Sequence, residues 1–364
     1  MKQDGTGEPV EGGGTDTVLA TTPYPPSPVI ADIVWDWSSH RRRAAGSDNW
    51  PMTWADDDHQ YTTWGDGGGF EGTNVKGRVT FGVARIEGGY EDYTGINIMG
   101  GVDPEQPHVE EIGYTWGLLF LDGVLYCYAG DSRAELYYSS DYGIHWQSAG
   151  WTLQDEGFIK VTILNYGRNY EGARDGYVYV YANTGPNLHR LNNDHVALAR
   201  VPKGQMRDRE AYEFFKGLQE GGEARWTADA AQMQPVFVYP GGVHWTMSVG
   251  HSPGLDRYFL LTNSAEWTEG EDLKVPTTNL EIFDAPNPWG PWTLAKACRN
   301  WKQTTYYAER YVFIFHFAPK WWRNGGKEFT MVFSGRGRYS DSTGNDSWNT
   351  INGRFVLWDE LDDV

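Results

Sequence analysis

Short runs of β-branched and aromatic residues recur along the whole chain, bounded by Gly, Asp, Asn and Pro. Apolar residues at helical spacing are scarce. The runs form clusters that return about every 50–70 residues, a spacing typical of propeller blades. This pattern predicts an all-β chain folded as a single β-propeller, with five blades expected first and six or seven also compatible. The expected strands are 50–55, 60–64 and 79–86; 117–120, 124–128 and 135–139; 159–164, 177–181 and 196–201; 243–249, 258–262 and 279–283; and 312–317, 329–333 and 354–358.

The two ends of the domain follow from composition. Residues 1–28 are rich in Gly, Thr, Pro and Glu and have no apolar core. We therefore expect a flexible linker there, not a signal peptide, and a propeller domain over 29–364. No apolar run is long enough to cross a bilayer. Cys127 and Cys298 lie far apart in strand-like surroundings, which predicts two buried free thiols.

Two segments depart from the strand pattern. Residues 207–217 predict a helix that Asp208 caps, with Tyr212 and Phe215 facing inward. Residues 287–292, with two prolines and two tryptophans, predict a turn between blades.

The formal net charge of −19 narrows the range of partners. Such an acidic surface repels nucleic acid and anionic membranes, so we expect neither as a partner. The 18 Trp and 22 Tyr residues offer rings that can stack on sugars, which favours a polysaccharide or oligosaccharide ligand. A monomer is the default expectation for a propeller.

The first cluster carries the main candidate chemistry. Its first two strands, 50–55 and 60–64, are joined by an acidic turn, and Asp48 and Asp66 lie just outside their far ends. Strands paired across a tight turn bring their far ends side by side, so these two carboxylates are expected to be close. A carboxylate pair can supply the acid and the base or nucleophile of a glycosidase.

Asp48 and Asp66 are therefore the first two catalytic candidates. We expect Trp50, Trp64 and His59 to contact the substrate from the same hairpin. The alternative is structural: Asp48 would cap a turn and Asp66 would form an Asx turn with the glycines that follow it.

Arg174 and Asp175 form a second constellation, at the start of the strand that begins with Tyr177. Arg174 could clamp a carboxylate or a pair of hydroxyls, Asp175 could act as acid or base, and Tyr177 could contact the substrate. An ordinary exposed ion pair in a turn is equally compatible with these residues.

Glu309 precedes the apolar strand 311–317 and is the fourth catalytic candidate. Burial among neighbouring aromatic residues would raise its pKa and make it a general acid. A solvated carboxylate at a strand end is the alternative. His316 lies inside the same strand, where a core or channel-lining histidine is expected.

No metal or organic cofactor is predicted. His59, His145, His244 and His251 are scattered, and no His-x-x-x-His or Cys-x-x-Cys spacing occurs. The turn 56–58, with three Asp residues, could hold a structural calcium ion, although a hydrated turn is the commoner use of such a sequence.

Ser139-Ser140-Asp141-Tyr142-Gly143-Ile144-His145-Trp146 matches Ser-x-Asp-x-Gly-x-x-Trp and resembles the Asp-box hairpin of sialidase-like propellers. The resemblance implies that Ser139 and Asp141 bond the turn, Gly143 takes the tight backbone position and Trp146 packs beneath. It also implies that this hairpin lies away from the active site, so Asp141 is not a catalytic candidate.

Two further resemblances concern function. Gly46-Ser47-Asp48, Trp54-Ala55-Asp56-Asp57, Tyr61-Thr62 and Gly65-Asp66 resemble the first blade of a domain of unknown function linked to bacterial and phage endo-D-arabinanases, although Gly67 stands where Thr is typical. Segments 165–181, 198–203 and 209–215 and Arg257-Tyr258 resemble poorly characterised secreted bacterial propeller proteins. These resemblances imply a carbohydrate-active propeller that is secreted or on the cell surface.

Three functions remain open at this point. A glycoside hydrolase needs two carboxylates about 5–5.5 Å apart for retention or about 6.5–9.5 Å for inversion. A polysaccharide lyase needs a His or Tyr base and an Arg that neutralises a uronate, for which Arg174 with Tyr177, or one of the histidines, are candidates. A lectin-like propeller needs only aromatic platforms. The hydrolase is the first hypothesis, the lyase the second and the lectin the third.

Overall fold

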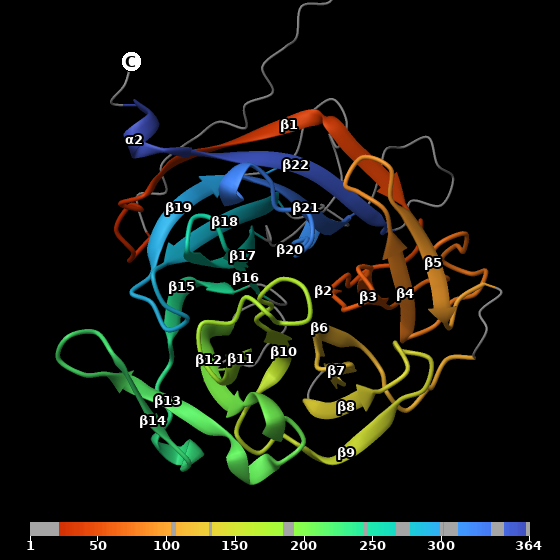
Figure 1. Cartoon of the computed structure of the whole chain (residues 1–364), viewed down its shortest axis with the longest axis horizontal. Coiled ribbons are helices and arrows are strands. Elements are labelled where there is room, and N and C mark those ends of the chain that lie inside the picture. Colours follow the sequence, from red (N-terminus) through yellow and green to blue (C-terminus); the bar gives the residue numbers. More distant parts are fainter. Residues whose placement is uncertain are drawn as a thin grey trace, which may run out of the picture.

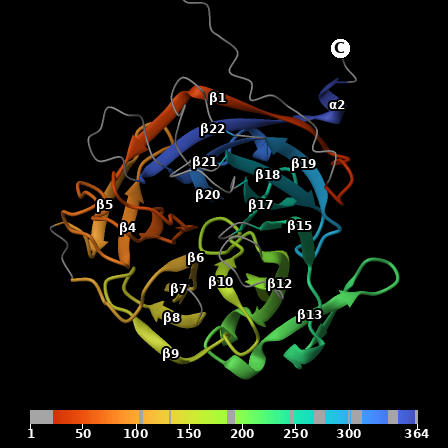
Figure 2. The same ribbon diagram turned by 180° about the vertical axis from the view of Figure 1, so that it is seen from behind.

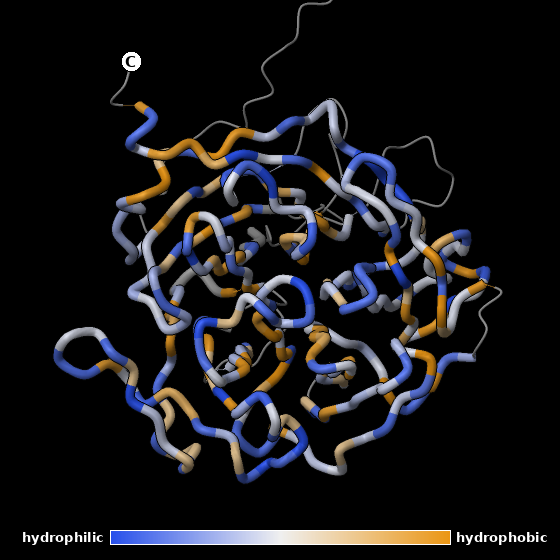
Figure 3. Tube along the Cα trace, in the orientation of Figure 1, coloured by the Kyte–Doolittle hydropathy of each residue, from blue (hydrophilic) through white to orange (hydrophobic). Residues whose placement is uncertain are grey.

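The chain forms five small antiparallel sheets arranged in a ring, so the expected five-bladed β-propeller is confirmed (Figure 1). The computed structural model describes residues 22–102, 107–130, 133–184, 193–243, 247–266, 277–298, 301, 312–335 and 346–361. Apolar stretches recur along the strands in the tube of Figure 3, whereas the loops that join them are mostly polar. Apolar side chains are packed within and between the blades.

Each blade is built from consecutive strands. Blade 1 holds β2 (Met52–Trp54), β3 (Gln60–Trp64), β4 (Gly82–Glu87) and β5 (Thr94–Met99); blade 2 holds β6 (Thr115–Leu121), β7 (Val124–Ala129), β8 (Glu135–Ser139) and β9 (Gln147–Thr152). Blade 3 holds β10 (Ile159–Ile163), β11 (Tyr177–Thr184), β12 (Asn193–Pro202), β13 (Glu213–Leu218), β14 (Ala224–Thr227) and β15 (Phe237–Val243). Blade 4 holds β16 (Ser248–Ser252), β17 (Arg257–Glu266), β18 (Thr277–Ala285) and β19 (Thr293–Cys298); blade 5 holds β20 (Val312–Phe317), β21 (Glu328–Gly335), β22 (Trp348–Leu357) and β1 (Ile30–Arg43). The chain ends in a short helical turn, α2 (Trp358–Leu361).

The ring is closed by strands from the two ends of the domain. β1 pairs antiparallel with β22, from Ile30 opposite Leu357 to Arg43 opposite Trp348. Figures 1 and 2 both show these two strands side by side on the outside of blade 5. The sequence did not predict β1, because its partner lies more than 300 residues away and its second half is polar.

The propeller has two faces with different roles. We call the back face the one that carries the turns joining β2 to β3, β6 to β7, β10 to β11, β16 to β17 and β20 to β21. Contacts between these turns define it: the Asn169 backbone N–H donates to Trp54 (2.8 Å), the Asp122 N–H donates to the Asn169 side chain (2.9 Å), and Lys320 pairs with Asp58. The front face is the opposite one, where these inner strands begin.

Two local expectations are corrected. Residues 207–217 are not a helix: Arg209–Ala211 is a single 3-10 turn, and β13 follows at once. Pairing of Glu213 with Arg200 on β12 outweighs local helix propensity. The cap was correctly predicted, since the Asp208 side chain accepts from the Glu210 N–H (3.1 Å). Tyr212 and Phe215 are buried, as expected.

The second correction concerns residues 287–292, which join β18 to β19 within blade 4 and do not connect two blades. Both cysteines are buried free thiols, as predicted. Across the described residues, no helix has the length and apolar character needed to span a membrane.

A buried ion pair crosses blade 4. The Arg257 guanidinium donates to Asp284 Oδ2 from Nε (2.8 Å) and Nη2 (2.5 Å), and the Thr293 hydroxyl donates to Asp284 Oδ1 (2.6 Å). The Asp284 side chain is fully buried. Removing one partner of such a pair leaves an uncompensated buried charge.

We expect Asp284→Ala to lower the free energy of unfolding by about 3–5 kcal/mol, measured by urea denaturation. Glu87→Ala, which removes the half-exposed partner of Arg85, should cost less than about 1 kcal/mol. Equal losses in the two variants would contradict this assignment.

Candidate active site

The far ends of the first hairpin meet as expected. Asp48 and Gly65 exchange two backbone hydrogen bonds of 3.0 Å each, N–H to O in both directions. Such a pair holds its Cα atoms about 5.5 Å apart. Asp66 follows Gly65 directly and has a positive φ of 58°, so the strand ends there and the chain turns. Asp48 and Asp66 therefore lie beside each other at the front face of blade 1.

The glycine run after Asp66 is explained by close packing against Gly46 and Ser47. A Cβ on Gly67 would stand 2.2 Å from the Gly46 carbonyl oxygen and 2.3 Å from Ser47 Oγ. Ser47 Oγ also accepts the Gly69 N–H (2.9 Å). A threonine at position 67 would not fit this backbone, which accounts for the departure from the pattern of the resembling family.

Asp66 is oriented by two side chains that the sequence did not single out. The Tyr114 hydroxyl donates to Asp66 Oδ1 (2.7 Å), and Arg78 Nη2 lies 2.6 Å from the same oxygen. Both donors reach Oδ1, and in the described part of the chain no donor reaches Oδ2. The Tyr114 ring packs where a Cβ of Gly65 would be. No local sequence pattern indicated that Tyr114 belongs to this site, because it precedes the first strand of the next blade and only the fold brings it to Asp66.

The pKa of Tyr114 responds to both carboxylates. Burial raises its pKa first, and the hydrogen bond to Asp66 and the negative charges of Asp66 and Asp48 raise it further. The phenol therefore stays protonated at neutral pH and remains a hydrogen-bond donor to Asp66. An effect of both carboxylates on one phenol agrees with their adjacent backbone positions.

Asp48 is held between the first and the last blade. Its residue is 7% exposed. The next residue, Asn49, donates its N–H to Ser334 Oγ of β21 (3.0 Å), and the Gly46 N–H donates to the carbonyl oxygen of Asp346 (2.5 Å). Ring closure thus fixes the backbone around Asp48 from both sides.

Three inner strands are irregular at their front ends. Register shifts occur at Thr115/Gly117 in β6, at Ile159/Thr162 in β10 and at Phe313/Phe315 in β20. Within two of the shifts, Lys160 (φ 50°) and Ile314 (φ 53°) adopt the left-handed region. This region is uncommon for any residue other than glycine and most unfavourable for the β-branched Ile314.

These irregular positions gather next to Tyr114. Trp116, Phe313 and Ile314 form one apolar cluster against which Tyr114 packs. The Lys160 Nζ lies 5.2 Å from the Trp116 ring centroid. Bulges and strained backbone are enriched beside active sites, where they redirect side chains.

The expectation that Trp50 and Trp64 contact substrate is wrong for this structure. Trp50 is 0% and Trp64 1% exposed. Trp50 packs on Trp64, Phe70 and Trp348, and the Trp64 indole N–H donates to the Gly67 carbonyl (2.9 Å). Both rings support the backbone of the site from below and offer no face to a sugar.

His59 and the acidic turn belong to the back face, at the other end of the hairpin from Asp48. The expected role of His59 beside Asp48 and Asp66 is therefore wrong. The three carboxylates of the turn serve different donors: Asp56 accepts from Tyr142, Asp57 from Tyr61 and Asp58 from Trp54. In the described ranges, no group of three His, Cys, Asp or Glu side chains could hold a metal ion, so calcium here gains no support.

The Arg174–Asp175–Tyr177 constellation also lies on the back face, away from Asp48 and Asp66. Asp175 accepts the Tyr177 N–H (2.9 Å) and the Tyr179 hydroxyl (2.6 Å), so it stabilises the start of β11. Arg174 donates to the Pro286 carbonyl (3.0 Å) and pairs with Asp256, tying blade 3 to blade 4. The structure thus corrects the expectation that these residues share a site with Asp48.

Glu309 and His244 lie outside the described residues. The strand after Glu309, β20, begins at Val312 on the front face.

The Ser139–Trp146 turn has the contacts that its resemblance implies. Ser139 Oγ donates to Asp141 (2.7 Å) and accepts the Gly143 N–H (2.9 Å), and the Trp146 indole N–H donates to the Gly143 carbonyl (3.0 Å). The turn joins β8 to β9 and lies on the back face. Its kinship with the Asp box remains a resemblance.

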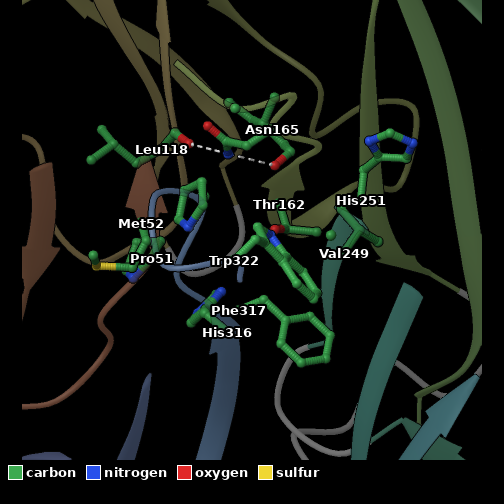
Figure 4. A pocket seen from close by; sticks show the side chains of 15 residues that line it. Pro51, Met52, Leu118, Thr162, Asn165, Val249, His251, His316, Phe317 and Trp322 are labelled. Atoms are coloured by element: carbon green, nitrogen blue, oxygen red, sulfur yellow. Dashed lines mark hydrogen bonds between the residues drawn. The ribbon is translucent and has the colours of Figure 1, made fainter. Parts of the chain in front are cut away.

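A narrow cavity of about 20 Å³ lies on the propeller axis, lined by residues of all five inner strands (Figure 4). The Asn165 side chain donates to the carbonyls of Leu118 (2.9 Å) and Ile163 (3.3 Å) at its edge. Two lining histidines, His251 and His316, are more than nine-tenths buried, and their Nε2 atoms have no hydrogen-bond partner among the described residues.

Both histidines are neutral at physiological pH. Burial lowers the pKa of His316 to about 3. Burial, followed by the charge of Arg174, lowers the pKa of His251 to about 4. Both rings titrate near pH 6.5 in the unfolded chain, so the unfolded state binds more protons below that pH.

The free energy of unfolding should consequently be highest above about pH 6.5 and fall as the pH drops towards 4. His251 should account for about 3 kcal/mol of that fall. We expect urea denaturation between pH 7 and pH 4 to give a shallower pH slope for His251→Gln than for the wild type, because Gln takes up no proton. Identical slopes would contradict the assignment.

The packing of the glycine run gives a separate prediction. Gly67→Ala should lower the free energy of unfolding by about 1–3 kcal/mol, because its methyl group overlaps the Gly46–Ser47 backbone. Gly176→Ala, where nothing lies within 4 Å of the added carbon, should be neutral or slightly stabilising. Thermal unfolding of the two variants checks this, and a neutral Gly67→Ala would show that the segment is loosely packed.

Comparison with solved structures gives weak likeness to several glycoside hydrolases. An arabinoxylan arabinofuranohydrolase of glycoside hydrolase family 43 from Bacillus subtilis is 11% identical with a TM-score of 0.47, covering 84% of this chain and 63% of its own. A family 117 glycoside hydrolase from Zobellia galactanivorans is 10% identical (TM-score 0.44), covering 89% and 90%. A putative glycosidase from Bacteroides thetaiotaomicron is 14% identical (TM-score 0.45), covering 94% and 95%. Similarity at this level does not show that this chain shares the activity of those enzymes.

No curated protein matches the chain. A family model, DUF4185, described as a domain of unknown function, matches residues 128–340, more than half of the chain. The match runs from β7 to just beyond β21 and leaves Asp48 and Asp66 outside it. The chain therefore belongs to the DUF4185 family.

Proposed function

We propose that this protein is a glycoside hydrolase that cleaves a polysaccharide or oligosaccharide between Asp48 and Asp66. The observation that carries the proposal is the backbone bridge of Asp48 with Gly65, which places Asp48 beside Asp66 at the front face of blade 1, with the Tyr114 hydroxyl bonded to Asp66. Glycoside hydrolysis needs two such groups, one to protonate the leaving oxygen and one to act as base or nucleophile. We further propose that the protein acts as a secreted or cell-surface monomer.

The surroundings of the two carboxylates suggest their roles. Asp66 is the more exposed, Arg78 offsets its charge, and one of its oxygens has no donor in the described residues. We assign it the base or nucleophile, and Asp48 the general acid. Tyr114 positions Asp66, and its raised pKa keeps that hydrogen bond in place across the neutral range.

The same surroundings weigh against a lyase. A lyase base must take a proton, so a tyrosine in that role needs a lowered pKa, whereas the pKa of Tyr114 is raised. Two of the lyase candidates expected from the sequence, Arg174 and Tyr177, are engaged in contacts on the back face.

The test is a screen of the purified protein against neutral and uronate-containing polysaccharides, following reducing ends and unsaturated-uronate absorbance together. We expect reducing ends without that absorbance. Asp48→Asn and Asp66→Asn should each lose about 10²–10⁴-fold in rate, because each removes one proton-transfer or nucleophilic group.

Asp175→Asn is the matched control, a carboxylate on the back face, and should retain the wild-type rate. Unsaturated products would replace the hydrolase with a lyase. Glycan binding that both aspartate variants retain, with no cleavage by any form of the protein, would make it a lectin.

A further inference from the structure

A second groove lies on the rim of the propeller, outside the candidate active site. It has a volume of about 390 Å³, within the range of small-ligand sites. Blade 5 supplies most of its lining, from β1, β21, β22 and the turn before β21, and the turn between β4 and β5 of blade 1 supplies Tyr90 and Glu91. Both of these turns belong to the back face, so the groove is separate from Asp48 and Asp66.

The floor of the groove is shaped by a glycine. Gly353 pairs with Trp35 on one side and Phe329 on the other. A Cβ on Gly353 would stand 2.4 Å from the Phe329 ring and 3.1 Å from the Trp35 ring. A residue with a side chain would therefore not fit at position 353, and the Phe329 and Trp35 rings pack against the Gly353 backbone. Val34, next to Trp35, is 46% exposed at the edge of the groove.

One wall is a fixed aromatic ring. The Arg323 guanidinium carbon lies 3.8 Å from the Tyr90 ring centroid. Arg323 is itself held by hydrogen bonds to the Trp321 carbonyl (2.9 Å) and to Thr330 Oγ1 (3.1 Å). A ring stacked on a restrained cation loses little freedom when a ligand packs beside it.

The groove also presents polar atoms that have no hydrogen-bond partner in the described part of the chain. Asn352 accepts from Thr330 through Oδ1 (2.7 Å), and its Nδ2 donor has no partner among the described residues. The Tyr90 hydroxyl and the Glu91 carboxylate are likewise without a partner there. Together they offer a donor, an acceptor and a group that can be either.

The charge balance selects the class of ligand. The lining holds three carboxylates, Asp36, Glu91 and Glu328, and two guanidiniums, Arg323 and Arg354. Arg323 stacks on Tyr90, and the chain as a whole carries −19. An anionic ligand would be repelled, whereas a neutral one rich in hydroxyl groups could use donors, acceptors and ring together.

We propose that this rim groove binds a neutral oligosaccharide segment as a non-catalytic site, so that a polymer is held at a place distinct from the carboxylate pair. Binding in the rim groove does not require that Asp48 and Asp66 cleave the polymer.

The test is native affinity electrophoresis of the full chain carrying Asp48→Asn, with soluble arabinan, arabinoxylan or galactan cast in the gel. Val34→Arg fills the edge of the groove from an exposed position, so it should fold normally. We expect at least one polysaccharide to retard the parent and Val34→Arg to weaken that retardation about tenfold.

Leu218→Arg is the matched control. Leu218 is 40% exposed on blade 3, far from the groove in the ring, and the substitution makes the same change in charge. Its retardation should equal that of the parent.

Retardation by none of the three polymers, or equal retardation of Val34→Arg and the parent, would overturn the proposal. Failure of the cleavage screen with Val34-dependent retardation would remove the hydrolase assignment and leave the rim site standing.

Discussion

The pairing of β1 with β22 is the constraint on which the candidate site depends. A closed ring leaves only short, protected strand edges, and here the N-terminal strand supplies the outer edge of a blade built from C-terminal strands. The chain leaves β1 at Arg43 and reaches Asp48 within five residues. Bonds from Gly46 to Asp346 and from Asn49 to Ser334 fix that passage against blade 5. Closure of the ring and the position of Asp48 therefore arise from the same contacts.

The two faces of the ring are organised differently. On the back face, polar side chains are used to tie blades together: Arg174 bridges blades 3 and 4, and Lys320 bridges blades 5 and 1. On the front face, Asp66 keeps an oxygen without a donor among the described residues, and Lys160 and Ile314 have strained backbones beside the Tyr114 cluster. Strain maintained next to an underused carboxylate is typical of a site that contacts a ligand.

Sequence patterns predicted the strands best where the signal was local. β3 and β8 have the bounds expected from alternation and flanking turns, because a hairpin specifies its own partner. The outer strands β1, β5, β9 and β19 were missed. The partner of β1 comes from the other end of the chain, and β5 is largely exposed.

The candidate site was predicted only in part, for a similar reason. The nearness of Asp48 to Asp66 follows from one hairpin and was correctly expected. Whether Trp50 packs inward or outward depends on blade 5, and Tyr114 reaches Asp66 from blade 2. The Arg174–Asp175 pair was predicted to bind substrate and act as acid or base because the sequence alone does not show which face of the ring a turn occupies.

The proposed hydrolysis requires that water attack the anomeric carbon of the bond cleaved between Asp48 and Asp66. The most direct measurement is cleavage of a polysaccharide in ¹⁸O-labelled water, followed by mass spectrometry of the products. We expect one labelled oxygen at each new reducing end, with these ends formed about 10²–10⁴-fold more slowly when Asp66 is replaced by Asn. Unlabelled products carrying a double bond, or labelled ends formed at the wild-type rate in both the Asp48 and the Asp66 variants, would contradict it.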